Sequence, residues 1–205
     1  LDNIKVITDD IAIAVKDADL MIEALPESLE LKEQFYEEVS GLAPEKTIFA
    51  SNSSTFIPSQ LAPYPDRPEK FLNMHFANQI WKFNVVEIMG TSQTSPEVIE
   101  EDTEFAREIN MVLVILNKEY HGYILNSLLI PLLASGRSLW AKGVADPAMI
   151  DKDWMISTGA PMGPFGILDM VGLRTAAQIE RNAYAQTKDE SHKEIADKME
   201  QMIQE

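Results

Sequence analysis

Residues 20–50 read LMIEALPESLELKEQFYEEVSGLAPEKTIFA, and this stretch decides the fold class. Its first residues, Leu20–Leu25, form a short apolar run that predicts a buried strand, and Thr47–Ala50 at its end predicts another strand. Between them, residues 28–41 predict an amphipathic helix that ends at a glycine. The apolar stripe of this helix consists of Leu31, Phe35, Val39 and Leu42. Two strands joined by a crossover helix predict parallel neighbours in one sheet.

The same alternation of strands and helices continues to about residue 118. Further strands are predicted over residues 71–75, 83–89 and 111–116, and a further helix over residues 96–109. Repeated strand–helix–strand units predict an α/β fold with a mostly parallel sheet. We therefore place a first domain over residues 1–118.

From residue 119 onward the strand signals stop, and we expect an all-α second domain over residues 119–205. Its helices are predicted over residues 122–142, 146–158, 163–172 and 191–204. Asp146 is placed as an N-cap, and Pro131 within the first of these helices predicts a kink.

The composition excludes several classes of protein. The chain has 205 residues with 33 acidic and 17 basic side chains, so its net charge is −16. Such a charge opposes binding to nucleic acids and to anionic membrane surfaces. There is no cysteine, which excludes disulfides, thiolate catalysis and cysteine zinc sites, and we predict no metal site. The longest apolar runs are too short to span a bilayer, and no signal peptide is visible.

His75 and Glu87 form the strongest candidate pair. His75 ends the apolar run FLNMH, and catalytic groups in α/β sheets collect at the carboxyl ends of strands. Glu87 lies within the apolar run VVEIM, where an unpaired carboxylate is costly. A returning loop would place the two strands side by side, and a carboxylate bonded to an imidazole orients it as a general base. Alternatively, Glu87 points to solvent and His75 is a satisfied loop histidine, and the spacing leaves both readings open.

Other polar residues have a structural alternative beside the functional one. The segment Ser51–Thr55 follows a predicted strand and either binds a polar ligand or caps a helix that starts near Pro58. Glu27 and Lys32 read as a solvated pair at the start of a helix. His121 is expected in a linker, and His192 on an exposed helix.

Six motifs give the sequence a resemblance to the 3-hydroxyacyl-CoA dehydrogenase family, which includes bacterial 3-hydroxybutyryl-CoA dehydrogenases. They are ADLMIEALPESLELK (18–32), FASNSST (49–55), MHFANQ (74–79), VVEIMG (85–90), HGYILN (121–126) and GAPMGPFGILDMVGLRT (159–175). They follow the family order across nearly the whole chain. The resemblance implies a Rossmann-like NAD-binding domain followed by a helical domain that binds substrate and forms a homodimer.

The resemblance also assigns roles to individual residues. His75 would be the base that takes the proton of the 3-hydroxyl group, and Glu87 would orient it. Ser54 would hydrogen-bond the substrate oxygen, with Asn126 beside the same reacting group. The residues at the nicotinamide-ribose part of the cofactor site would be Glu27, Lys32, Ser54 and Asn78.

The sequence departs from the family pattern in several places. Ala77 and Gln79 replace Phe and Pro, while His121 and Ser127 replace Pro and Arg, and these changes put the fit of the substrate in doubt. The glycine turn G-x-G-x-x-G that seats the pyrophosphate is absent from the sequence. Because the first residue is Leu1 rather than Met, we expect the segment with this turn to precede it.

The resemblance implies an NAD-dependent enzyme of fatty acid metabolism that oxidises L-3-hydroxyacyl-CoA, in the first place 3-hydroxybutyryl-CoA, or reduces the 3-oxo product. The absence of cysteine suits a reducing compartment, so we expect the protein in the cytoplasm. Two alternatives stay open. One is a related dehydrogenase of sugar acids such as L-gulonate, and the other is a binding protein of the same fold without catalysis.

Overall fold

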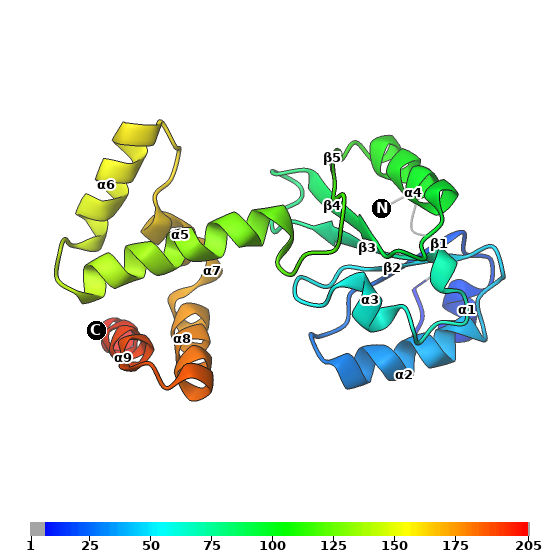
Figure 1. The fold of residues 1–205 in the computed structure, drawn as a ribbon, viewed down its shortest axis with the longest axis horizontal. Coiled ribbons are helices and arrows are strands. Elements are labelled where there is room, and N and C mark those ends of the chain that lie inside the picture. Colours follow the sequence, from blue (N-terminus) through cyan, green and yellow to red (C-terminus); the bar gives the residue numbers. More distant parts are fainter. Residues whose placement is uncertain (1–6, 205) are drawn as a thin grey trace. The chain divides into compact units, whose positions relative to one another are not determined.

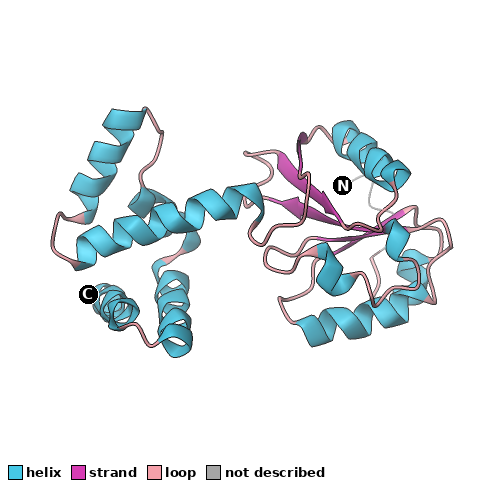
Figure 2. Ribbon diagram, viewed as in Figure 1, coloured by secondary structure: helices cyan, strands magenta, loops and turns pink. Residues whose placement is uncertain are grey.

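The structure, a computed structural model, describes residues 7–204. Contacts between residues divide the chain into two units, Leu1–Ile124 and Leu125–Glu205. The first unit contains a sheet and helices, and the second is built from helices (Figures 1 and 2). This arrangement confirms the expected fold class, a Rossmann-like α/β domain followed by an all-α domain.

The sheet has five strands in the order of the sequence. They are β1 (Leu20–Glu23), β2 (Ile48–Ser51), β3 (Phe71–Phe76), β4 (Val85–Gly90) and β5 (Val112–Ile115). The pairs β1–β2, β2–β3 and β4–β5 are parallel, whereas β3 and β4 are antiparallel. The antiparallel pair arises because residues 77–84 return the chain directly, without a crossover helix. The expectation of a mostly parallel sheet is confirmed.

Helices cover both faces of this sheet (Figure 1). They are α1 (Ile11–Val15), α2 (Leu29–Ser40), α3 (Pro58–Leu61) and α4 (Pro96–Glu108), with a short 3₁₀ helix, η1, over Pro68–Lys70. Helices α1, α2 and α3 pack with Phe49 and Phe71 on one face. Helix α4 packs with Ala50, Leu72 and Met74 on the other. Successive residues of a strand thus pack against the helices on opposite faces of the sheet, as strand geometry requires.

Helix α2 forms where it was predicted, but its buried face differs from the predicted stripe. Ser28 caps its start, and Gly41 follows its last residue. Lys32, Tyr36 and Val39 are buried, whereas two members of the predicted stripe, Leu31 and Leu42, are exposed. The prediction counted apolar residues only, and it missed that a buried carboxylate can hold Lys32 and Tyr36 in the interior.

Two other elements of this unit differ from expectation. Strand β1 is less buried than its apolar sequence predicted, because it is an edge strand of the described sheet and Ile22 is exposed. Helix α1 was not predicted, since five residues are too few for a periodic pattern. Its start is fixed locally by Asp10, whose side chain accepts hydrogen bonds from the backbone N–H groups of Ala12 and Ile13.

The second unit contains most of α5 and four further helices. The bounds are α5 (Tyr123–Ala141), α6 (Pro147–Thr158), α7 (Pro164–Val171), α8 (Leu173–Thr187) and α9 (Glu190–Gln204). Their core is formed by Leu133, Leu168, Ala176, Ala177, Ile195 and Met199. Asp146 caps α6 as predicted. Helix α8 was missed, because it follows α7 immediately after Gly172 and its sequence is mostly polar.

Helix α5 continues through Pro131 and is long and apolar enough, by length and composition, to cross a membrane. The sequence prediction that no stretch is long enough to span a bilayer considered only uninterrupted apolar runs, and α5 contains polar residues between its apolar ones. The helix also contains Arg137, which is buried and lies 2.7 Å from a carboxylate oxygen of Glu180 on α8. A buried ion pair of this kind shows that one face of α5 packs inside the helical unit.

Candidate active site

His75 and Glu87 lie side by side on the paired strands β3 and β4. They are partners in the antiparallel register, and Nδ1 of His75 is 3.1 Å from Oε2 of Glu87. Both side chains are buried, with 7% and 3% of their surface exposed. The structure therefore rejects the alternative in which Glu87 points to solvent, and it brings together the two residues that the sequence singled out.

The second carboxylate oxygen of Glu87 also accepts a hydrogen bond. Oε1 accepts a hydrogen bond of 2.9 Å from the backbone N–H of Ile124, in the first turn of α5. An anionic side chain at this position compensates an N–H group that has no partner within the helix. Glu87 thus holds the imidazole with one oxygen and the start of α5 with the other.

This arrangement fixes the chemistry that His75 can perform. A carboxylate only accepts hydrogen bonds, so Nδ1 of His75 carries the hydrogen in the pair with Glu87. In the neutral ring, Nε2 then has the free lone pair and can take a proton from a substrate. The pair therefore has the arrangement that a general base and its orienting carboxylate require.

Two residues that the sequence did not single out complete the surroundings of the base. The ring of Tyr123 stacks on His75, with centroids 4.5 Å apart and planes inclined by 24°. The Tyr123 hydroxyl donates to the backbone carbonyl of Ser53 and accepts from Nδ2 of Asn73. Asn73 shares a face of β3 with His75, because alternate strand residues point the same way. Tyr123 lies within the motif HGYILN, but the motif gives it no role, because its partners are 48 to 70 positions away.

A second polar cluster lies at the carboxyl ends of β1 and β2. The carboxylate of Glu27 accepts hydrogen bonds from the backbone N–H and hydroxyl of Ser54 and from the hydroxyl of Ser53. Burial acts to raise the pKa of Glu27, but these hydrogen bonds and the nearby Lys32 outweigh it and lower the pKa. Glu27 is therefore ionised at neutral pH, and its side chain is partly exposed, so a ligand can reach it.

The expectation that Glu27 and Lys32 form a solvated pair is wrong. Lys32 is 1% exposed, with its Nζ 2.6 Å from Oε1 of Glu23 and 3.7 Å from Oε2 of Glu27. Glu23 also accepts from the hydroxyls of Ser51 and Tyr36. The signal that could have found this cluster is Glu23 itself, a carboxylate within the apolar run LMIEAL.

The segment Ser51–Thr55 does not cap α3 with its side chains. The N-cap position of α3 is Ile57, whose backbone N–H is bound by the side chain of Gln60. The polar side chains instead face Glu23 and Glu27, while Asn52 accepts from the backbone N–H of Phe76 at the end of β3. Of the two readings of this segment, the capping one is therefore wrong.

The remaining predicted residues lie in several places. Asn78 is exposed in the loop after β3, and Asn126 lies on α5 in the second unit. Ser54 is bound to Glu27. His121 is exposed in the linker before α5, with Nδ1 3.2 Å from the carbonyl oxygen of Thr55.

His192 is not a free surface residue as expected. Its Nδ1 lies 2.6 Å from Oε2 of Glu180, a carboxylate that is 1% exposed and whose other oxygen is 2.7 Å from Arg137. The three residues come from α9, α8 and α5 and join these helices inside the second unit. The role of this cluster is structural.

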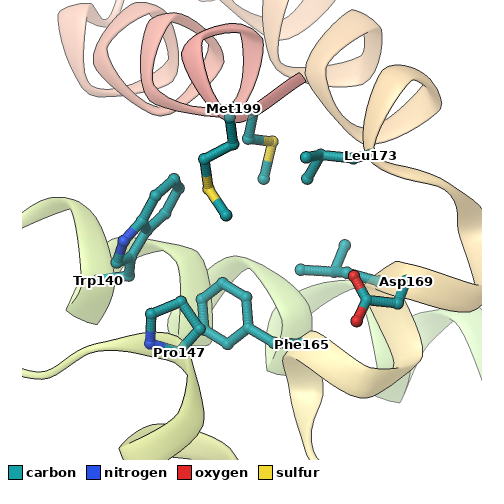
Figure 3. Close-up of a pocket in the computed structure, with 8 residues that line it drawn as sticks. Trp140, Pro147, Phe165, Asp169, Leu173 and Met199 are labelled. Atoms are coloured by element: carbon teal, nitrogen blue, oxygen red, sulfur yellow. The ribbon is translucent and has the colours of Figure 1, made fainter. Parts of the chain in front are cut away.

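The second unit also encloses an apolar cavity of about 140 Å³ (Figure 3). Its lining residues are Trp140, Pro147, Phe165, Leu168, Asp169, Leu173, Met199 and Met202. Asp169 is the one charged residue among them, and none of the predicted site residues lines the cavity. Ligand sites for molecules of drug size measure about 300 to 1,000 Å³, so this cavity is too small for a dinucleotide.

The residues at the strand ends fit one part of a dinucleotide. The ionised carboxylate of Glu27 can accept hydrogen bonds from ribose hydroxyls, and it lies where ligands bind to open α/β sheets, outside the carboxyl ends of the strands. A pyrophosphate needs a glycine turn at a helix N-terminus, and the sequence contains no G-x-G-x-x-G. These residues therefore fit a ribose of the dinucleotide, and the resemblance to the family implies that it is the nicotinamide ribose.

Models of one protein family match both parts of the chain. Residues 1–120 match the family model of the 3-hydroxyacyl-CoA dehydrogenase NAD binding domain, and residues 122–205 match that of its C-terminal domain. The mitochondrial hydroxyacyl-coenzyme A dehydrogenase of Sus scrofa is 36% identical over 166 residues, covering 81% of this chain and 52% of that protein. The chain thus spans about half the length of this relative.

Two further proteins extend the comparison. The 3-hydroxybutyryl-CoA dehydrogenase of Clostridioides difficile is 31% identical over 172 residues, covering 84% of this chain and 61% of that protein. A solved structure of a diketoreductase, described for its dual catalysis of dicarbonyl compounds, is 52% identical with a TM-score of 0.88. The match covers 95% of this chain and 67% of that one. With both of its domain models matched in order along the sequence, the chain belongs to the 3-hydroxyacyl-CoA dehydrogenase family.

Proposed function

We propose that the complete protein interconverts an L-3-hydroxyacyl-CoA and its 3-oxo form, with His75 as the general base and NAD as the cofactor. The observation that carries the proposal is the buried pair of His75 and Glu87, with Nδ1 bound to the carboxylate. A bound NAD would supply the hydride acceptor for the carbon that bears the hydroxyl group.

The residues of the chain provide the rest of the reaction. Nε2 of His75 takes the hydroxyl proton as the carbonyl group forms, and Glu87 stabilises the resulting imidazolium through Nδ1–H. In the reverse direction the same nitrogen returns the proton to the new alkoxide oxygen. Glu27, which is ionised and partly exposed, binds the nicotinamide ribose.

The substrate class rests on family membership and on the names of two relatives that act on acyl-CoA compounds. The 52% identity to a diketoreductase favours a second candidate, a dicarbonyl compound without coenzyme A. Both candidates share one chemistry, because a 3-oxoacyl thioester is itself a dicarbonyl with its ketone two carbons from the second carbonyl. We place 3-hydroxybutyryl-CoA first.

A substrate panel tests this order. The complete protein is given NADH with acetoacetyl-CoA or with pentane-2,4-dione, and NAD with L-gulonate, while absorbance at the nicotinamide band is followed. Reduction of acetoacetyl-CoA with the highest kcat/KM supports the proposal. A higher value for the free diketone favours the second candidate, turnover of L-gulonate alone indicates a sugar-acid dehydrogenase, and no turnover of any compound indicates a protein without this catalysis.

We further propose that the complete protein is a homodimer formed through its helical unit. Leu128 and Ile130 on α5 and Ile156 on α6 are large apolar residues that are 70%, 58% and 73% exposed. Where exposed apolar side chains adjoin one another they mark association surfaces, and Leu125, three positions before Leu128 on the same helix, is also 41% exposed. Light scattering should give twice the mass of one chain, and Leu128→Glu should give the mass of a monomer. A monomeric parent protein contradicts this part of the proposal.

A further inference from the structure

Tyr123 occupies an unusual position beside the base. Its side chain is 1% exposed, and its backbone has φ +53°, a left-handed conformation that is uncommon for a bulky residue. Gly122 before it also has a positive φ, of +82°. Such a conformation costs free energy and is kept only where the surrounding contacts enforce it.

The hydroxyl group of Tyr123 joins two segments of the first unit by hydrogen bonds. Its hydroxyl donates to the carbonyl oxygen of Ser53 at 2.7 Å, so its oxygen is available to accept from Nδ2 of Asn73 at 2.8 Å. Burial raises the pKa of Tyr123, which therefore keeps its proton at any working pH. Through this hydroxyl, the segment that binds Glu27 is connected to the strand that bears His75.

The ring of Tyr123 supplies a constraint that Glu87 cannot supply. The hydrogen bond from Nδ1 to Glu87 holds one edge of the imidazole, but the side chain can still turn about its Cα–Cβ and Cβ–Cγ bonds and so leave Glu87. The stacked ring of Tyr123, 4.5 Å away and inclined by 24°, defines the plane of the imidazole. The next residue, Ile124, donates its backbone N–H to Glu87. One turn of the chain therefore holds both members of the pair.

We propose that Tyr123 is a positioning residue, which sets the plane of the His75 imidazole and ties it to the Ser53–Ser54 segment of the cofactor side. The inference rests on the proposed function in one respect, that His75 is the base. Loss of the ring should leave the base present but misdirected, which lowers kcat and leaves cofactor binding nearly unchanged.

The test uses the complete protein with two substitutions at this position. Tyr123→Phe keeps the stacked ring and removes both hydrogen bonds, whereas Tyr123→Leu removes the ring. Tyr120→Leu, the same change at an exposed tyrosine three positions earlier, is the control. The ¹H–¹⁵N NMR signals of the His75 imidazole report its tautomer directly, and steady-state kinetics separate kcat from the KM for NADH.

In the parent protein, NMR should show the Nδ1–H tautomer of His75 alone. We expect Tyr123→Leu to show both tautomers and to lower kcat about 10- to 100-fold, with the KM for NADH changed by less than about twofold. Tyr123→Phe should keep the parental tautomer and lose about 3- to 10-fold in kcat, so that the conservative variant restores most of the activity. The control should behave as the parent.

Two results overturn the inference: a Tyr123→Leu protein with the parental tautomer and kcat, or a Tyr123→Phe protein that is as impaired as Tyr123→Leu. If Tyr123→Leu does not fold, Tyr123→Met, which also lacks the ring, takes its place in both measurements. A parent protein without turnover contradicts the proposed function and not the positioning role, which the NMR tautomer then decides.

Discussion

Nδ1 of His75 lies 3.1 Å from Oε2 of Glu87, and the same two residues are directly opposite each other in the register of β3 and β4. The pair is therefore fixed by the backbone of two central strands and not by a mobile loop. Because both side chains are buried, water does not compete for the hydrogen bond between them. A base that is held in this way is oriented before substrate binds.

The first prediction concerns this pair. In the complete enzyme, His75→Ala should lower kcat by about two to four powers of ten, because the proton acceptor is lost. Glu87→Gln should cause a loss of similar size. The double variant should be little worse than either single variant, since the two residues act as one unit. Initial rates with saturating substrate give the comparison, and additive losses would show that the residues act independently.

The second prediction concerns Lys32. Lys32→Met leaves the buried carboxylate of Glu23 without its 2.6 Å partner, and removing one member of a buried pair costs about 3 to 5 kcal/mol. Urea denaturation should show this loss, and adding Glu23→Gln should recover part of it. The matched control is Lys46→Met, which breaks an exposed pair with Asp19 and should cost less than about 1 kcal/mol. Equal costs at the two sites would contradict the prediction.

The third prediction concerns the pH dependence of stability. Asp102 on α4 is 1% exposed, neither of its carboxylate oxygens has a partner among the described residues, and burial raises its pKa to about 7. The folded state thus binds this proton more tightly than the unfolded state, whose carboxyl titrates near its ordinary value. The resulting stabilisation is complete below about pH 4 and is lost as the pH rises to about 7.

Asp102→Asn removes this titration. At pH 8 the variant should exceed the parent in free energy of unfolding by roughly 2 to 4 kcal/mol, and the difference should shrink toward pH 4. Denaturant titrations at several pH values measure it, with Glu101→Gln at the exposed neighbouring position as the control. A difference that does not change with pH would exclude Asp102 as its source.

The fourth prediction concerns Gly163, the N-cap residue of α7. A Cβ atom at this position would lie 2.4 Å from Cγ and 2.6 Å from the backbone Cα of Asp151. Asp151 also caps α7, because its carboxylate accepts from the backbone N–H groups of Phe165 and Gly166, each at 2.8 Å. Gly163→Ala should therefore lower the free energy of unfolding by about 2 to 4 kcal/mol through overpacking and a displaced cap.

The control for this substitution is Gly41→Ala. Gly41 has an ordinary helical backbone, and the nearest atom to an added Cβ would be 3.8 Å away. Thermal denaturation of the two variants should therefore give a clear loss for Gly163→Ala and almost none for Gly41→Ala. A Gly163→Ala protein as stable as the parent would mean that Asp151 moves aside without loss of its cap.

The sequence by itself determined the elements whose causes are local. The strand–helix–strand pattern of residues 20–50 predicted β1, α2 and β2, and Asp146 as an N-cap predicted where α6 begins. Cap hydrogen bonds and apolar periodicity act within a few residues, so they can be read from a short stretch. The six motifs were sufficient to suggest the family. Glu87, an acidic residue within an apolar strand, was sufficient to suggest a partner for His75.

The tertiary structure alone decided which polar groups meet. Lys32 is a buried cation because the carboxylates of Glu23 and Glu27 both lie beside its Nζ. His192 belongs to a buried cluster because it pairs with Glu180. Tyr123 meets His75, Asn73 and Ser53 across 48 to 70 positions of sequence. A buried polar side chain is stable only beside its partner, and that partner is set by strand register and by layer packing. Strand register and layer packing cannot be read from the residues next to the side chain. The candidate base therefore came from the sequence, and the residues that surround it came from the fold.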